Sequence, residues 1–439
     1  MVQMGYRQTR MHKESALHRV TILCLGLCPW ACRKERLRLL LQDSVLSLAD
    51  GVADTLGLLR RPLESEPLLA TARRRSGLSE FGDASFIDPL RRLLSACMDE
   101  ASLSLVGRMA TRWDVVRFLT NLLRFQDAEA KDAGILRQQI ERPIFITGLP
   151  RSGTTFLHRL LLNDPENRAP LVWQTIYPYP PARGPDTRPA RVARQLRAFE
   201  RLAPEFRALH PLDATSPQEC SEITAHVFRS LRFDTTYQIP SYRNWLDHAS
   251  HAPAYRFHRR FLQHLQHQAA PGGRWVVKCP DHLFALDAIR TEYPDARLVF
   301  VHRNPVKVLL SVAKLTEVVR RPFTRRLDPR EIGRQESARW LEGTQQMVAV
   351  GDDAGLPEPI HHVHHNALVS DPVGTVAVLY RHFGLPLAPG VAAAVGKYAR
   401  ERPQGGYGPR DYRFEDHGLD TDTERQKFRG YTERFGIAV

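Results

Sequence analysis

Cysteine is scarce in this chain, and long apolar runs are missing from it. Six cysteines in 439 residues are too few and too widely spread to form a disulfide framework. The apolar stretch 20–32 is only about a dozen residues long, short of the ~20 that a membrane-spanning helix needs. We therefore expect a cytoplasmic protein in a reducing compartment, without a membrane anchor.

Metal-ligand patterns and nucleic-acid-binding arms are missing as well. Cys24, Cys28 and Cys32 recur every four residues, which is not the paired C-x-x-C spacing of a structural zinc site. The histidine-rich run 361–365 would place its side chains on opposite faces of a strand. Basic residues are scattered along the chain and are not grouped into blocks of like charge. We predict neither a metal site nor a nucleic-acid partner.

The composition is otherwise that of a globular protein. Hydrophobic residues make up 43% of the chain and charged residues 25%, both ordinary values. The formal net charge of +14 would suit an anionic small ligand or an acidic acceptor, and an arginine-rich proteome explains it equally well. Composition therefore permits an enzyme with an anionic substrate but does not select one.

The stretch 143–163 has the pattern of a strand, a loop and a helix. It begins with apolar or β-branched residues, continues with a turn rich in glycine and proline, and ends without a helix breaker. Unpaired backbone N–H groups and the positive end of the helix dipole meet at such a turn, and they bind phosphate. The spacing Gly148-x-x-x-x-Gly153 is that of a phosphate loop. However, Thr154 replaces the lysine of ATP and GTP sites, and Arg151 is the cation of the loop. We predict a phosphate site of another kind, the alternative being a tight turn with incidental hydroxyls.

The remaining pattern indicates an α/β fold. Helical periodicity without strand signals extends over 33–139, so we expect these helices to cover one side of a core. Further strands are expected at 274–278, 297–302 and 360–364, each followed by a helix, and a short one at 171–173. Strands that alternate with helices form a parallel sheet flanked by helices, which binds ligands at the carboxyl ends of its strands.

Three segments together resemble the sulfotransferase family, of the bacterial type related to the tyrosylprotein and cytosolic sulfotransferases. They are Gly148-Leu-Pro-Arg-Ser-Gly-Thr-Thr155, Lys278-Cys-Pro-Asp-His-Leu283, and Val301-His-Arg-Asn-Pro305 followed by Ser311. Their order and spacing make the likeness specific, and it covers about Arg142 to the C-terminus. The resemblance implies a P-loop-NTPase-like parallel sheet. It also implies transfer of a sulfonate group from 3′-phosphoadenosine 5′-phosphosulfate (PAPS) to a hydroxyl or amine.

The resemblance also assigns residues that bind PAPS. Arg303 and Ser311 match the pair that binds the 3′-phosphate. The loop residues that match the 5′-phosphosulfate site are Arg151, Ser152, Gly153, Thr154 and Thr155. A nucleotide with a phosphate at each end of its ribose needs two separate anion sites, and arginine suits them because its guanidinium donates two N–H bonds in one plane.

For the reaction we expect in-line displacement at sulfur, without a metal. Negative charge develops on the bridging oxygen and on the sulfonate oxygens, so nearby cations lower the barrier. Arg151 and Lys278 are the candidate cations. The acceptor must lose a proton, and His282, just past the strand 274–278, is the first candidate base.

One pair of residues departs from the family pattern. Relatives commonly have a Trp-Glu pair after the phosphate-loop helix, and this chain has Trp173-Gln174. Glutamine cannot act as a base. Either His282 acts alone, or Glu219 substitutes, or the acceptor is acidic enough to need little help.

We divide the chain into a leader of uncertain structure (1–32), a helical N-terminal extension (33–140) and a sulfotransferase domain (141–439). Two other functions stay open. A P-loop phosphotransferase would need Mg²⁺ and a lysine in place of Thr154. A catalytically impaired nucleotide-binding protein of the same fold is favoured by Gln174. Sugar, phenol, lipid, peptide and polyketide acceptors are all compatible with the sequence.

Overall fold

The computed structural model describes residues 47–180, 184–269, 272–402 and 413–438. The chain forms two compact units, Met1–Arg61 and Pro62–Val439. The predicted leader, residues 1–32, lies outside the described residues. In the first unit, residues 47–55 are helical and are followed by the 3-10 turn η1 (Leu58–Arg60).

A five-stranded sheet forms the centre of the second unit, and all its described pairings are parallel. The strand order is β2-β3-β1-β4-β5. The strands are β1 (Ile144–Gly148), β2 (Asn167–Arg168), β3 (Arg274–Lys278), β4 (Arg297–His302) and β5 (His361–His364). The predicted parallel α/β sheet is confirmed. Because β1 lies between β3 and β4, the three predicted motifs follow three adjacent strands.

The short strand expected at 171–173 is wrong. Leu171 makes only an isolated antiparallel bridge with Pro217, and Val172–Ile176 form the helix α7. The side chain of Gln174 explains the difference, since its Oε1 accepts a hydrogen bond from the backbone N–H of Leu171 at 2.9 Å. This bond caps the first turn of the helix.

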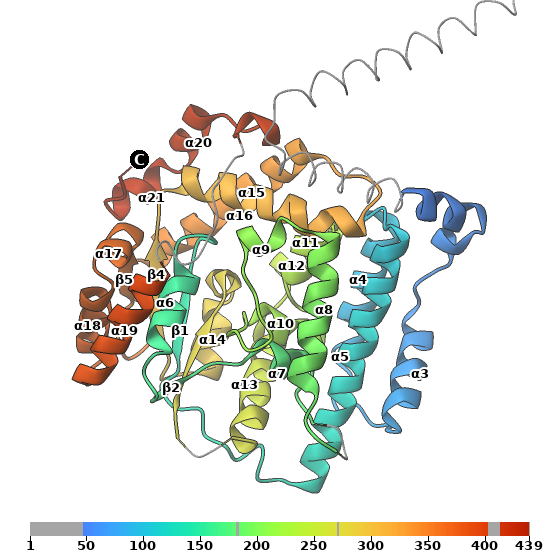
Figure 1. Ribbon diagram of the computed structural model, residues 1–439, viewed down its shortest axis with the longest axis horizontal. Coiled ribbons are helices and arrows are strands. Elements are labelled where there is room, and N and C mark those ends of the chain that lie inside the picture. Colours follow the sequence, from blue (N-terminus) through green and yellow to red (C-terminus); the bar gives the residue numbers. More distant parts are fainter. Residues whose placement is uncertain (1–46, 181–183, 270–271, 403–412, 439) are drawn as a thin grey trace, which may run out of the picture. The chain divides into compact units, whose positions relative to one another are not determined.

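Side chains of the central strands alternate between two cores, as the period of a strand requires. In β1, Ile144 and Ile146 pack with α6 (Thr154–Leu161), α18 (Pro372–His382) and α19 (Pro389–Glu401) on one face. Phe145 belongs to the larger core on the other face. Figure 1 shows α17, α18 and α19 grouped beside β5. A sheet buried on both faces explains why the centres of β1, β3 and β4 are apolar on both sides.

The larger core includes the N-terminal helices of this unit. They are α3 (Ser65–Ser76), α4 (Ile87–Asp99) and α5 (Leu105–Lys131). Leu119 and Phe125 of α5 are fully buried in the same core as Phe145 and Phe300 of the sheet. The helical character predicted for this region is therefore present. The predicted boundary near residue 140 does not coincide with a break in the packing.

A long segment of chain between β2 and β3 is helical. It contains α7, α8 (Arg188–Leu202), α9 (Phe206–Leu209), α10 (Ser221–Thr224), η2 (Ala225–Val227), α11 (Arg232–Thr236), α12 (Pro240–His248) and α13 (Ala252–His267). The aromatics Phe228, Phe233, Tyr237 and Tyr242 of this segment are buried core residues. The segment is tied to the sheet where the N–H of Cys220 donates to the carbonyl of Lys278 at 3.2 Å.

The remaining helices follow β3, β4 and β5. They are η3 (Pro280–Phe284), α14 (Leu286–Glu292), α15 (Pro305–Arg320), η4 (Arg321–Phe323), α16 (Pro329–Val350), α17 (His365–Ser370), η6 (Glu415–His417), α20 (Thr421–Lys427) and α21 (Arg429–Arg434). Asn304 caps the N-terminus of α15, since its side chain accepts hydrogen bonds from the N–H groups of Val306 and Lys307. This cap fixes the direction in which the chain leaves β4, and with it the position of Arg303.

Candidate active site

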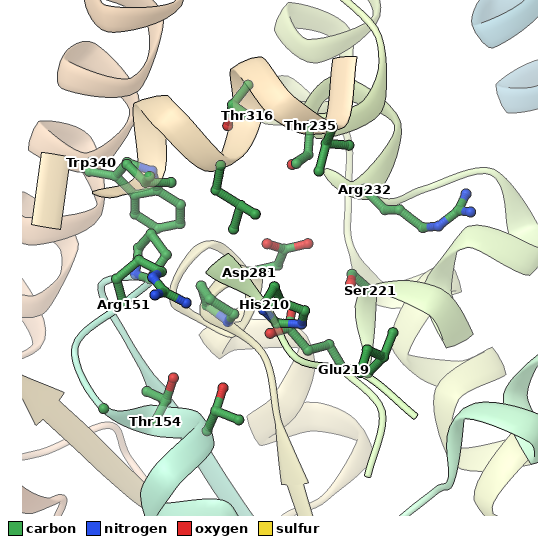
Figure 2. A pocket seen from close by; sticks show the side chains of 18 of the residues that line it. Arg151, Thr154, His210, Glu219, Ser221, Arg232, Thr235, Asp281, Thr316 and Trp340 are labelled. Carbon is green, nitrogen blue, oxygen red and sulfur yellow. The ribbon is translucent and has the colours of Figure 1, made fainter. Parts of the chain in front are cut away.

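A cavity of about 640 Å³ opens at the carboxyl ends of β1, β3 and β4. The phosphate loop forms one wall, and η3 contributes Pro280 and Asp281. Residues 206–236 form the opposite wall, and side chains of α15, α16 and α17 complete the lining (Figure 2). The volume is in the usual range for small-molecule and cofactor sites, roughly 300–1,000 Å³. The cavity thus lies at the edge of the sheet where the sequence predicts ligand binding.

The two glycines of the phosphate loop are required by its backbone. Gly148 has φ 139° and Gly153 has φ 104°, both in the region that favours glycine. A Cβ at Gly148 would meet the carbonyl oxygen of Val301 at 2.4 Å. Gly153 is the N-cap of α6, and the next two residues, Thr154 and Thr155, line the cavity. The N-terminus of α6 is therefore exposed to the cavity, which places its N–H groups within reach of an anion.

Arg151, Arg303 and Ser311 are brought together at the apex of this loop. Arg151 has φ 62°, a conformation that costs a non-glycine residue about 1–2 kcal/mol. Arg303 stabilises it, since its Nη1 donates to the carbonyl oxygen of Arg151 at 2.6 Å. The Nε of Arg151 donates to Ser311 Oγ at 3.0 Å. The residues predicted for the 5′-phosphosulfate and for the 3′-phosphate are thus in direct contact.

Ser152 is buried inside the loop. Its side chain has no exposed surface, and its Oγ has no hydrogen-bond partner within the described part of the chain. A buried hydroxyl without a partner costs folding free energy, about 1–3 kcal/mol. Such a group is typical of a site that a ligand completes.

Lys278 and Glu219 form an ion pair beneath the cavity. Glu219 lines the cavity, whereas Lys278 is only 3% exposed and is not part of the lining. Burial raises the pKa of Glu219, but the charge of Lys278, its hydrogen bond to Glu219, and the charges of His210 and His158 together lower the pKa overall. His210 lies in the same lining, and burial lowers its pKa to about 4. At neutral pH, Glu219 is therefore ionised and His210 is neutral.

The structure places His282 away from the cavity. It is fully buried among Phe145, Tyr255 and His258, and its Nδ1 is hydrogen-bonded to the hydroxyl of Tyr255. Burial lowers its pKa well below the usual value for histidine. Since His282 is not among the residues that line the cavity, this position disfavours it as the base.

Asp281, the residue before His282, lines the cavity instead. Its carboxylate lies between Arg151 and Ser221 in Figure 2. Sequence reasoning missed this residue, although it belongs to the motif 278–283, because a single acidic side chain has no distinctive spacing. The helical turn η3 directs Asp281 toward the cavity and His282 toward the core.

Gln174, the departure from the family pattern, does not line the cavity. Its amide caps α7, and the neighbouring Trp173 ring stacks under the guanidinium of Arg188, with 4.5 Å between the ring centre and the guanidinium carbon. The carboxylate of a glutamate at position 174 could accept the same hydrogen bond from the N–H of Leu171, and it would lie at the start of α7, outside the cavity. The absence of a carboxylate at residue 174 therefore removes no group from the described cavity.

Among the described residues, no three or more His, Cys, Asp or Glu side chains are grouped so that they could hold a metal ion. The helices of the described ranges include none with the length and apolar character that crossing a membrane requires.

Comparison with known proteins identifies the family. The sequence model described as "Sulfotransferase family" matches residues 143–389. Two solved structures are similar over most of this chain. Sulfotransferase STF1 of Mycobacterium tuberculosis H37Rv is 30% identical with a TM-score of 0.73, covering 84% of this chain and 98% of its own. Sulfotransferase STF9 of Mycobacterium avium is 26% identical with a TM-score of 0.73, covering 85% and 97%.

A curated relative is also similar. The omega-hydroxy-beta-dihydromenaquinone-9 sulfotransferase Stf3 of Mycobacterium bovis is 25% identical over 262 residues, which is 55% of this chain. The match spans 63% of the length of that relative. Its name states its own acceptor, an omega-hydroxylated menaquinone.

Proposed function

The chain belongs to the sulfotransferase family, and from this premise we propose that it transfers a sulfonate group from PAPS to a hydroxyl, or to an amine, of an acceptor that enters the same cavity. The observation that supports this most is the contact among Arg151, Arg303 and Ser311 at the mouth of the phosphate loop. Two strand ends, β1 and β4, supply arginines that line one cavity. A doubly phosphorylated nucleotide is the kind of ligand that needs both.

In the proposed complex, the 5′-phosphosulfate lies at the N-terminus of α6. The donors would be the backbone N–H groups of Gly153 to Thr155, the hydroxyls of Thr154 and Thr155, and the Ser152 hydroxyl, which has no partner among the described residues. The backbone N–H of Ser152 already donates to the carbonyl oxygen of Leu149 at 3.3 Å. Arg303 and Ser311 would bind the 3′-phosphate, as the family resemblance implies. Because Arg151 donates to Ser311, its guanidinium would lie between the two proposed anion sites.

In the proposed reaction, the acceptor oxygen attacks sulfur while the bond from sulfur to the bridging oxygen breaks. Arg151 would stabilise the negative charge that develops on the bridging and sulfonate oxygens, a contribution of about 3–4 kcal/mol if it resembles other preorganised donors. Lys278 would act through Glu219, because the ion pair between them separates Lys278 from the cavity. We therefore propose that Lys278 has a positioning role.

The acceptor would occupy the part of the cavity away from the phosphate loop. Phe206, Leu212, Leu315 and Val319 contribute apolar surface there, and Thr235 and Thr316 contribute hydroxyls. This mixture supports an acceptor with an apolar body next to its hydroxyl. The acceptor named for Stf3 has this character. The free thiols of Cys97, Cys220 and Cys279 agree with the cytoplasmic location that we propose.

Isothermal calorimetry tests the donor. We expect adenosine 3′,5′-bisphosphate, the desulfonated product of PAPS, to bind without Mg²⁺ and more tightly than ATP. Single-turnover transfer from radiolabelled PAPS to a panel of phenols and long-chain alcohols then tests the reaction. Tighter binding of ATP that depends on Mg²⁺ would replace this proposal with a phosphotransferase.

A further inference from the structure

Asp281 is a carboxylate in the cavity that lies within the motif 278–283 but has no role so far in the proposed donor site or reaction. Figure 2 shows its side chain pointing into the space between the phosphate loop and the wall formed by residues 206–236. Its Oδ2 is buried and has no hydrogen-bond partner in the part of the chain that the structure describes. An unpaired buried carboxylate oxygen is costly to the folded protein, so its presence suggests a role that a bound ligand completes.

The position of Asp281 follows from the local fold. Lys278 ends β3 at the edge of the sheet where the ligand cavity opens, and η3 begins at Pro280. Because successive side chains of a 3-10 helix differ by about 120° in direction, Asp281 and His282 cannot both face the cavity. Asp281 faces the cavity, and His282 packs in the core.

Among the other carboxylates of the cavity, Glu222 is paired with Arg117 and Arg232, and Glu336 accepts hydrogen bonds from Thr316 and Trp340. Glu219 also lines the cavity, but it is paired with Lys278, whose charge lowers its pKa and weakens it as a base. His210 lines the cavity as well, and burial leaves it with a pKa of about 4. A base works best when its pKa lies near the working pH, and neither of these groups meets that condition.

Four groups face Asp281, and their net effect together with burial is to raise its pKa, whereas the pKa values of Glu219 and His210 are lowered. They are Glu219, Lys278, Cys279 and Arg339. Burial, followed by the negative charge of Glu219, raises the pKa of Asp281 to about 7. Arg339, the hydrogen bond with Cys279 and the charge of Lys278 lower it only in part. The guanidinium of Arg339 is held instead by Asp247 at 2.7 Å and lies over the ring of Phe284.

We propose that Asp281 is the catalytic base that removes the proton from the acceptor, an inference that rests on the sulfonate transfer proposed above. The acceptor O–H bond breaks and its proton passes to the Asp281 carboxylate, while the acceptor oxygen forms a bond to sulfur. The bond between sulfur and the bridging oxygen breaks, and its electron pair leaves with the 5′-phosphate of adenosine 3′,5′-bisphosphate. Protonated Asp281 then loses its proton to water when the products leave. Glu219 stays ionised throughout and is a positioning residue.

The test compares Asp281→Asn with Glu219→Gln, using phenol and 4-nitrophenol as acceptors. Asparagine has nearly the same shape as aspartate but cannot take a proton. We expect Asp281→Asn to lower kcat for phenol by about 10²- to 10⁴-fold, the usual contribution of a general base. For 4-nitrophenol, which ionises without help, the loss should be much smaller. Calorimetry should show unchanged affinity for adenosine 3′,5′-bisphosphate.

In Glu219→Gln, the pH at which kcat/KM reaches half its maximum should fall, because a negative charge beside Asp281 is removed.

An equal loss for both phenols in Asp281→Asn would overturn the proposal, since it would indicate a structural role. So would retention of phenol activity in Asp281→Asn together with its loss in Glu219→Gln.

Infrared difference spectra of the protein with bound adenosine 3′,5′-bisphosphate provide a second test that needs no acceptor. We expect a carboxyl band that titrates between about pH 6 and 8 and disappears in Asp281→Asn. If no such band is present, the proposal fails even though donor binding succeeds. If the bisphosphate does not bind at all, it is the proposed function that fails.

Discussion

Two groups of buried polar side chains lie close together in this protein, and they differ in where their hydrogen-bond partners come from. In the first, Asp114 and Arg117 of α5 meet Glu222 and Arg232 from the segment between β2 and β3. Each of the four carboxylate oxygens accepts from an arginine, at distances of 2.7–2.8 Å. The guanidinium of Arg117 also lies over the ring of Phe118, 4.1 Å from its centre. We call these four residues the charge ring.

In the second group, the phosphate loop and η3, polar atoms lack partners. Ser152 Oγ and Asp281 Oδ2 are both buried without a hydrogen bond among the described residues. Both groups are expensive to bury, but only in the charge ring is every carboxylate oxygen paired within the protein, although Nε and Nη1 of Arg117 and Nη1 of Arg232 have no partner among the described residues. The comparison teaches that the carboxylates of the ring are neutralised by folding alone, whereas Ser152 and Asp281 are left for a ligand to complete.

Of the substitutions considered, Asp114→Ala in the charge ring should cause the largest loss in the free energy of unfolding. The change leaves Arg117 and Arg232 with one buried carboxylate between them, so we expect a loss of about 3–5 kcal/mol in the free energy of unfolding, measured with urea. Asp127→Ala is the matched control on the same helix, because Asp127 is paired with the exposed Lys131. The control should lose less than about 1 kcal/mol. Similar losses in the two variants would contradict the structural role of the ring.

Of the substitutions near the phosphate loop, Arg303→Ala should cause the largest loss of donor affinity. It removes a charged donor to phosphate and also the support of the Arg151 carbonyl, so affinity for adenosine 3′,5′-bisphosphate should fall about 10- to 100-fold. Calorimetry measures this. Arg151→Ala should mainly slow the transfer step, seen in single-turnover kinetics. Equal losses of affinity in the two variants would show that their roles are not divided in this way.

Ser152→Ala sharpens the comparison because it separates binding from folding. The hydroxyl has no partner among the described residues, so its removal should not destabilise the protein and should raise the free energy of unfolding by about 1–3 kcal/mol. Donor affinity should fall about 3- to 10-fold, the value of one typical hydrogen bond. Ser337→Ala is the control, since that buried hydroxyl donates to Glu424 at 2.6 Å. The control should lose stability and keep donor affinity. The reverse pattern would count against the proposed donor site.

Glu317→Gln should have the smallest effect. Burial raises the pKa of this carboxylate, but a hydrogen bond with His417 and the nearby Lys314 and Arg321 lower it to about 2. A carboxylate with a lowered pKa stabilises the protein above its ordinary value of 4.5, and that contribution is lost as the pH falls toward 2. The variant should therefore be less stable at pH 7 by about 1 kcal/mol, since the site is partly exposed to solvent. Urea unfolding as a function of pH should show the difference disappearing below about pH 3. A constant difference at all pH values would show that packing, not charge, is responsible.

The sequence was sufficient for four of the five strands because the signals there are local, whereas β2 was not predicted. Strands 274–278 and 297–302 have apolar centres and lie between segments that contain proline or glycine, so both their bounds were predicted as observed. The segment 171–173 misled because a short apolar run does not distinguish a strand from a helical turn. Its outcome was decided by a side chain, that of Gln174.

The candidate site was predictable only as far as the strand ends. The loop residues and Arg303 could be placed because a parallel sheet brings its carboxyl ends together. Which way a side chain points after a strand depends on the turn that follows, and η3 reverses the expectation for His282 and Asp281. The pairing of Lys278 with Glu219 was equally hidden, because it joins residues from two segments that only the folded chain brings into contact.

The long helical segment between β2 and β3 has a consequence for how new specificities arise. The donor loop and Arg303 come from β1 and β4, whereas His210, Glu219 and Thr235 of the opposite wall all come from this one segment. Exchanging this segment with that of a relative would therefore replace much of the wall opposite the phosphate loop and leave Arg151 and Arg303 in place. Under the function proposed above, such a chimera should change which acceptor is sulfonated while still using the same donor.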